Sequence, residues 1–114
     1  MADSAEQLRG QIRTLQAQRR SLESKLMQPQ SMLAASLLER FLRTAGSPRT
    51  TPAYYLSRPE QGRSKLTYVK KEELAEVRQH CAAYRAFQQN LKQWRRVTAA
   101  LQQQWKQLQQ AQSR

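Results

Sequence analysis

Residues 74–108 read LAEVRQHCAAYRAFQQNLKQWRRVTAALQQQWKQL, and the apolar residues of this stretch decide the fold. They recur at steps of three and four, which keeps them on one face of a helix. We call this row the apolar seam. It consists of Leu74, Val77, Cys81, Tyr84, Phe87, Leu91, Trp94, Leu101, Trp105 and Leu108, with Thr98 and Ala99 continuing it between Trp94 and Leu101.

The seam predicts one long helix over residues 70–112. At a rise of about 1.5 Å per residue, a helix from Lys70 to Ala111 would be roughly 60 Å long. Glu72 and Glu73 fall in its first turn, where the helix dipole favours carboxylates. A single helix of this length cannot cover its own seam, so it needs a partner from this chain or from another copy.

Residues 1–28 carry a second helical pattern. Asp3 can cap free amide groups, and Glu6 three residues later suits a capping box. The positions that follow form a heptad register, Leu8, Ile12, Leu15, Arg19, Leu22 and Leu26. Arg19 is the exception: it either extends its charge towards solvent or marks a register-setting or ligand-facing position. Pro29 should end this helix, because proline has no amide donor and clashes with the preceding turn.

Residues 31–69 separate the two helical patterns. Over residues 31–46 we predict a short helix, capped by Ser31 and ended by Gly46. Its apolar face would consist of Leu33, Leu37, Leu38, Phe41 and Leu42. Over residues 47–69 we predict a loop and then a β-hairpin. Residues 54–56 and 66–69 are strong strand formers, and the Pro-Glu-Gln-Gly turn of residues 59–62 lies between them.

These elements predict a mainly α fold in one small domain. The helix over residues 1–28 would fold back along the helix over residues 70–112 as a long antiparallel, coiled-coil-like hairpin, with the small β-hairpin between them in the chain. Because two helices leave apolar surface uncovered, we expect a homo-oligomer assembled as a helical bundle. The expected partner or oligomer interface consists of Leu8, Ile12, Leu15, Leu22, Leu91, Trp94, Leu101, Trp105 and Leu108.

The charge balance is strongly positive, with 20 Lys and Arg against 8 Asp and Glu in 114 residues and a net charge of +12. A charge of this size favours a polyanion as partner, either nucleic acid or an anionic membrane surface. The membrane surface is the weaker candidate, because the apolar stripe follows a coiled-coil seam.

The chain lacks an apolar run long enough to span a bilayer and an apolar signal core, so we expect a cytoplasmic location.

Two groups of basic residues indicate surfaces that could bind phosphate groups. The first gathers on or beside the predicted hairpin and includes Arg58, Arg63, Lys65, Lys70 and Lys71, interleaved with Tyr54, Tyr55 and Tyr68. This mixture suits phosphate neutralisation with base or sugar stacking, although the tyrosines could equally form the packing face of the hairpin. The second group, which we call the basic stripe, runs beside the seam and consists of Arg78, Arg85, Lys92, Arg95 and Arg96. No acidic residue follows Val77, so this helix lacks the mixed charges of an ordinary solvated face.

A catalytic constellation is absent from the sequence. His80 is the single histidine and Cys81 the single cysteine, and adjacent helical residues point apart, which is poor geometry for a Cys–His pair. The chain has neither a glycine-rich phosphate loop nor a GxSxG motif. We therefore predict no enzymatic activity, no metal and no cofactor, and we expect Cys81 to be a small buried hydrophobe.

The hairpin region resembles a known family. Residues 52–58 read PAYYLSR, Gly62 and Lys65 follow, and residues 68–74 read YVKKEEL. This arrangement resembles the pattern HGPYYYLS…GK…YVPKEL of a family of small bacterial and archaeal proteins that has no settled function and often lies near transposase genes or other mobile elements. Many members carry a cysteine cluster before the tyrosines, but residues 46–51 here contain neither cysteine nor histidine. Lys70 replaces the usual proline. The resemblance implies a mobile-element or defence context.

The sequence thus predicts a non-catalytic accessory protein that binds DNA or structured RNA through its phosphate backbone and shape. Its enzyme partner would be a transposase, a recombinase or a reverse transcriptase. The alternative is a helical scaffold or adaptor that docks a partner protein through the apolar seam, with the positive charge facing an acidic protein surface.

Overall fold

The computed structural model describes residues 4–41, 43–44, 47–48 and 52–113. The chain forms two compact units. The helical unit consists of residues 1–29 and 87–114, and the sheet unit of residues 30–86. Helix α2, Leu74–Gln112, contributes to both units and is preceded by one 3₁₀ turn, Lys71–Glu73.

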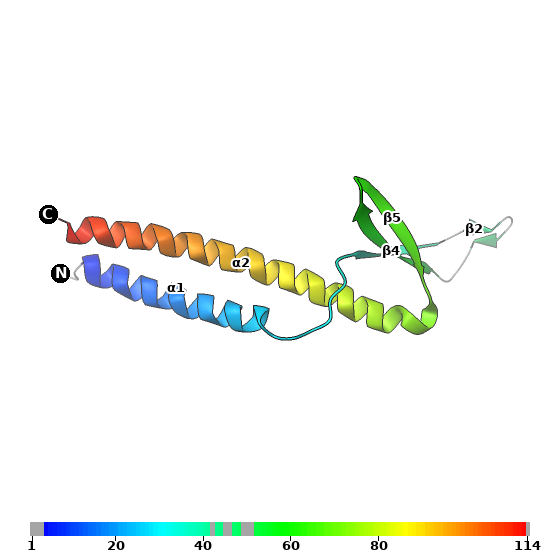
Figure 1. Cartoon of the computed structure of the whole chain (residues 1–114), viewed down its shortest axis with the longest axis horizontal. Helices are drawn as coiled ribbons and strands as arrows, with labels where there is room; N and C mark the ends of the chain where they lie inside the picture. The colour runs from blue at the N-terminus through cyan, green and yellow to red at the C-terminus, as the bar shows by residue number, and fades with distance from the viewer. Residues whose placement is uncertain (1–3, 42, 45–46, 49–51, 114) are drawn as a thin grey trace. The chain divides into compact units, whose positions relative to one another are not determined.

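The helical unit is an antiparallel pair of helices. Helix α1, Ser4–Leu26, lies alongside the C-terminal part of α2 (Figure 1). The core between them consists of Ala5, Ile12, Leu101 and Leu108, with Leu8, Leu15 and Val97 packed against it. The predicted antiparallel helical hairpin is therefore confirmed, and most of its core comes from the heptad and seam positions. The helix ends as expected just before Pro29.

The sheet unit contains a three-stranded antiparallel sheet of order β1-β4-β5. Its strands are β1, Ser36–Arg40, β4, Ala53–Glu60, and β5, Arg63–Val69 (Figure 1). The predicted hairpin is confirmed as β4 and β5. Gln61 and Gly62 connect these strands with φ angles of 50° and 77°. Positive φ at both central residues is typical of a tight two-residue hairpin turn, and glycine adopts it without steric cost.

The predicted short helix over residues 31–46 is wrong. Residues 36–40 form strand β1, and Arg43–Thr44 (β2) pairs with Ser47–Pro48 (β3) in a separate two-stranded ladder. A short apolar run fits a helix and a strand equally well. Here the run becomes a strand because it pairs with the edge of β4 that is not paired with β5. Phe41, expected on the apolar face, is exposed. Leu42 and the Gly46 cap lie outside the described residues.

One face of the sheet packs on α2. Residues directly opposite each other on antiparallel strands share a face, and alternate residues along a strand share one too. Leu37, Leu56 and Thr67 are therefore on one face, together with Tyr54 and Val69. This face, which we call the helix-facing side, packs against Leu74, Val77 and buried Cys81 of α2. The Leu33 amide donates to the carbonyl oxygen of His80 at 3.1 Å and ties the segment before β1 to the same helix.

Candidate nucleic-acid interface

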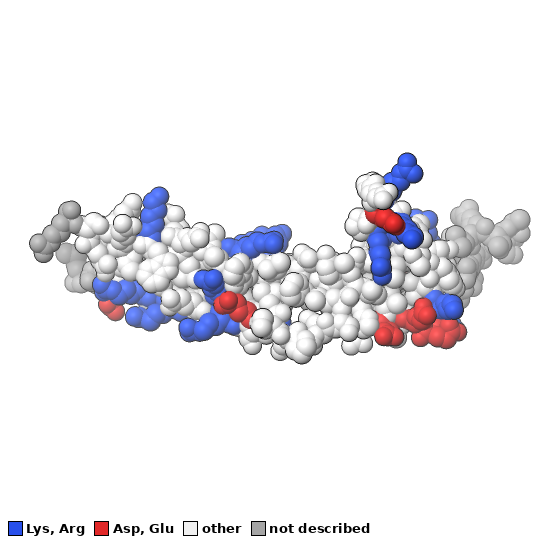
Figure 2. Space-filling view, viewed as in Figure 1, with Lys and Arg blue, Asp and Glu red and all other residues white. Residues whose placement is uncertain are grey.

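The helical unit carries the larger charge imbalance. Among its described residues, Glu6 and Glu23 are the only acidic side chains. The basic ones are Arg9, Arg13, Arg19, Arg20, Lys25, Lys92, Arg95, Arg96 and Lys106. On the face shown in Figure 2, Lys and Arg side chains are spread over this unit and carboxylates are few. Positive charge is thus concentrated on the pair of helices.

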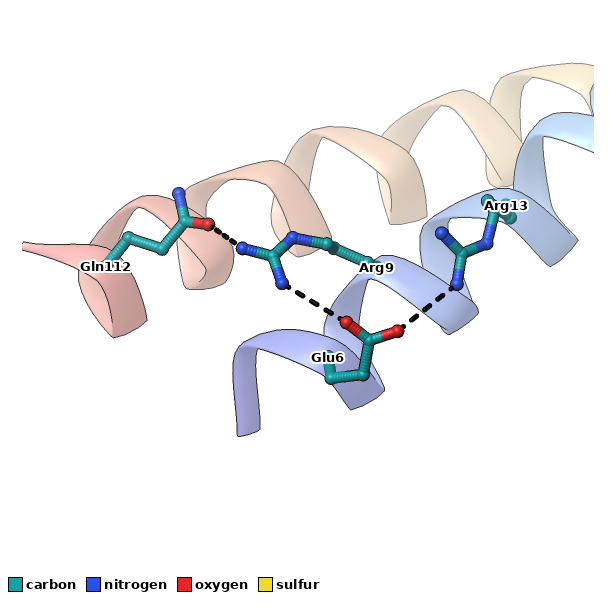
Figure 3. A network of polar contacts seen from close by, with 4 residues as sticks. All are labelled: Glu6, Arg9, Arg13 and Gln112. Carbon is teal, nitrogen blue, oxygen red and sulfur yellow. Dashed lines mark hydrogen bonds and ion pairs between the residues drawn. The ribbon is translucent and has the colours of Figure 1, made fainter. Parts of the chain in front are cut away.

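Both carboxylates among the described residues of the helical unit form ion pairs with arginines of α1. Glu6 lies between Arg9 and Arg13, with N–O distances of 3.3 and 3.7 Å, and Arg9 also donates to the side-chain oxygen of Gln112 (Figure 3). Glu23 lies 3.9 Å from Arg19. Exposed pairs of this kind contribute little to stability. Their importance is that no carboxylate of the described helical unit is left for the cations of α2.

The cations of α2 in this unit are exposed and unpaired. Lys92, Arg95, Arg96 and Lys106 lie on the surface, and none of them forms an ion pair with any described residue. Lys92, Arg95 and Arg96 are the C-terminal three residues of the basic stripe. The structure therefore leaves this part of the stripe free to meet an external anion.

The N-terminal two residues of the stripe belong to the sheet unit and have neighbours there. The guanidinium of Arg78 lies over the ring of Tyr54, 5.2 Å from its centroid, a cation–π contact. Arg85 is close enough to Cys81 to influence its titration. The five stripe residues thus form two groups. Lys92, Arg95 and Arg96 have no ion-pair partner among the described residues, whereas Arg78 and Arg85 interact with residues of the sheet unit.

The basic residues of the hairpin lie mainly on the helix-facing side of the sheet. Strand register places Arg58 opposite Lys65 and Glu60 opposite Arg63, all with the same parity as Leu56. Lys65 is 3.7 Å from Glu60, so part of this charge is neutralised within the hairpin. The remaining predicted cations, Lys70 and Lys71, are exposed immediately before α2.

The predicted hairpin tyrosines separate onto the two faces of the sheet. Tyr54 packs with the core of the sheet unit beneath Arg78. Tyr55 and Tyr68 point to the other face, where their ring centroids are 5.7 Å apart at an interplanar angle of 70°. Sequence reasoning missed that Leu38 of β1 and Leu66 of β5 share this second face. The period-two alternation along the strands is the signal that would have found them.

Cys81 is buried in the core of the sheet unit, as expected from the sequence. Burial raises the pKa of its thiol, and the positive charges of Arg85 and Arg58 offset only part of this effect. The thiol is therefore protonated at neutral pH, whereas the reactive form is the thiolate.

We expect Cys81 to react slowly with an aromatic disulfide reagent in the folded protein. The rate should rise with pH, because more thiolate forms as pH approaches the raised pKa, and it should increase sharply when urea unfolds the chain. Absorbance of the released thiolate dye measures both rates. Equal rates for folded and unfolded protein at the same pH would contradict the assigned burial.

In the part of the chain that the structure describes, no three His, Cys, Asp or Glu side chains gather closely enough to hold a metal ion. Within the same residues, neither helix combines the length and the apolarity that a bilayer crossing demands.

Residues 12–79 match the family described as "Domain of unknown function (DUF6788)", which covers more than half of the chain. The protein therefore belongs to this family. The matched region runs from the middle of α1 through the three-stranded sheet into the first turns of α2. No curated protein and no solved structure matches the chain.

Proposed function

We propose that this protein is a non-catalytic nucleic-acid-binding accessory protein that holds the phosphate backbone of DNA or structured RNA along its helical unit. One observation carries the proposal. Lys92, Arg95, Arg96 and Lys106 are exposed on α2 without an ion-pair partner among the described residues, while the two described carboxylates of the unit are paired elsewhere.

Backbone phosphates are the natural partners of such a surface. Each cation that neutralises a phosphate releases a condensed counterion, which favours binding without any contact to a base edge. Arg95 and Arg96 can each offer a planar guanidinium to two phosphate oxygens, whereas Lys92 and Lys106 act as point charges. Recognition of this kind depends on backbone and shape and discriminates weakly between sequences.

The hairpin motif supports a mobile-element setting. The YYLS segment, Gly62, Lys65 and the YVKKEEL segment resemble proteins whose genes often lie near transposase genes. In that setting the protein would assist a transposase, a recombinase or a reverse transcriptase, and copies of the helical unit would assemble into a homo-oligomeric bundle through apolar surface that two helices leave open.

A second candidate function is a helical scaffold that docks a partner protein. Trp105 favours it, because 49% of this seam side chain is exposed on the helical unit. Large exposed aromatics are frequent anchors of protein interfaces. The scaffold and the nucleic-acid proposals differ in whether Trp105 or the unpaired cations carry the binding energy.

The proposal predicts binding that falls steeply with salt. With about four phosphate contacts, log K should fall against log salt with a slope of roughly −3.6, so affinity should drop by about two orders of magnitude between 50 and 200 mM salt. Fluorescence anisotropy with a labelled 20-base-pair DNA duplex and a matched RNA hairpin measures this slope. Undetectable binding at 50 mM salt, or binding without salt dependence, would refute the proposal.

A further inference from the structure

The sheet has a second face that α2 does not cover. Strand register places Leu38 opposite Tyr55, Tyr55 opposite Tyr68, and Ser57 opposite Leu66. Directly opposite residues share a face, so these side chains lie together on the side away from the packed core. We call this the open face, defined by Leu38, Tyr55, Leu66 and Tyr68.

The open face exposes aromatic surface instead of burying it. Tyr68 is 56% exposed and Leu66 is 41% exposed, and Tyr55 meets Tyr68 edge to face at 5.7 Å. The next residue along β4 on this face is the small Ser57, opposite Leu66, whereas Arg40 of β1 lies on the same face beyond Tyr55. A flat ring of this kind is a stacking platform for another planar group.

A pocket adjoins Tyr68 where β5 meets the start of α2. Its volume is about 320 Å³, and its walls are formed by Pro52, Ala53, Tyr54, Tyr68, Val69 and Leu74, with Lys71 as the cation. Tyr54 and Val69 belong to the helix-facing side, so the pocket lies at the end of the sheet where Tyr68 of the open face meets that side. This volume is within the range of small-molecule sites, which combine mostly apolar walls with a few polar groups. A planar aromatic ligand with a negative group would suit this combination, with its ring against Tyr68 and its anion at Lys71.

We propose that the open face binds unpaired bases of single-stranded nucleic acid, with one base stacked on Tyr68 and its phosphate at Lys71. This inference deepens the proposed function and rests on it. Duplex bases are already stacked on each other, so the face selects single strands or extruded bases. Lys71 beside Tyr68 and the net charge of +12 favour an anionic occupant of this face. Stacking is sequence-tolerant, so all four bases should bind.

The test compares a single strand and a duplex of the same sequence. The single strand carries a 2-aminopurine, whose emission falls when the base stacks on a ring. Tyr68→Ala should weaken single-strand binding by about tenfold, whereas Tyr68→Phe, which keeps the ring, should bind as the wild type does. Because Tyr68 is mostly exposed, both variants should fold, which far-ultraviolet circular dichroism checks. Duplex affinity should change by less than about twofold in either variant.

The outcomes separate this inference from the proposed function. Unchanged single-strand affinity in Tyr68→Ala, with duplex binding intact, overturns the stacking site and leaves the backbone-binding proposal standing. Equal losses on single strand and duplex also overturn it, because a platform for unpaired bases cannot favour paired ones. A lower sedimentation mass with unchanged affinity assigns the face to contact between copies. Failure of the wild type to bind either nucleic acid refutes both proposals.

Discussion

Replacing Lys92, Arg95 and Arg96 with glutamine should reduce duplex affinity by about a hundredfold at ~0.1 M salt and lower the magnitude of the salt slope by about three. Each replaced side chain is exposed and lacks an ion-pair partner among the described residues, so the change should remove the proposed phosphate contacts without breaking a described ion pair. Glutamine also retains good helix propensity, which preserves α2. Anisotropy titrations at four salt concentrations measure both quantities.

A matched control distinguishes the position of the charge from its total. The triple variant Gln30→Glu, Gln61→Glu and Gln79→Glu has the same net charge, because each change in either set lowers the net charge by one unit. All three glutamines are exposed and lie in the sheet unit. The control should keep most of the duplex affinity. Equal losses in the two variants would mean that net charge, and not the helical unit, governs binding. If Trp105→Ala breaks a partner complex while the charge variants bind normally, the scaffold function is supported instead.

The second large effect concerns stability. Leu101 is only 3% exposed and lies in the core of the helical unit with Ile12 and Leu108. Leu101→Ala removes buried methyl and methylene groups and leaves a cavity between the helices, which typically costs about 2–5 kcal/mol of the free energy of unfolding. A core this small has little other apolar burial to compensate. Urea unfolding followed by circular dichroism at 222 nm measures the loss.

Met27 supplies the control for this experiment. It is 81% exposed just beyond the end of α1, so Met27→Ala should change the free energy of unfolding by less than about 0.5 kcal/mol. A loss in Leu101→Ala no larger than that in Met27→Ala would show that the helical pair does not depend on this core.

Much of the architecture follows from residue spacing. The three- and four-residue steps of the seam predict α2, and the heptad positions of residues 8–26 predict α1, because a one-sided apolar row requires a cover. The turn at residues 59–62 predicts the β-hairpin. Strand β1 could not be predicted in the same way. Leu37 and Leu38 are adjacent, and only pairing with β4 sends them to opposite faces of the sheet.

The candidate site was partly predictable. The sequence identifies Lys92, Arg95 and Arg96 as cations on the part of the helix after Val77, which carries no acidic residue. The structure adds that they have no ion-pair partner among the described residues. The roles of Tyr54 and Tyr55 could not be assigned beforehand. Neighbours in a strand point to opposite faces, but which one meets a helix depends on how the sheet packs on α2.

Arg19 is another residue whose position, but not whose partner, could be predicted from the spacing of the sequence. Its heptad position indicates a side chain near the partner helix, and the guanidinium lies 5.1 Å from the ring centroid of Trp94 on α2. A cation over an indole face is a favourable use of an arginine in an apolar row. The spacing predicts the proximity, whereas the aromatic partner emerges only from the antiparallel alignment of the two helices.

Strand β5 is an edge strand of the described sheet, so the peptide groups on its outer side have no neighbouring strand there. Such an edge invites lateral growth by identical chains into fibrils. Arg63 and Lys65 occupy alternate positions on it, and their mutual repulsion across an incoming copy opposes that growth. These cations of the hairpin should therefore disfavour association of copies along this edge.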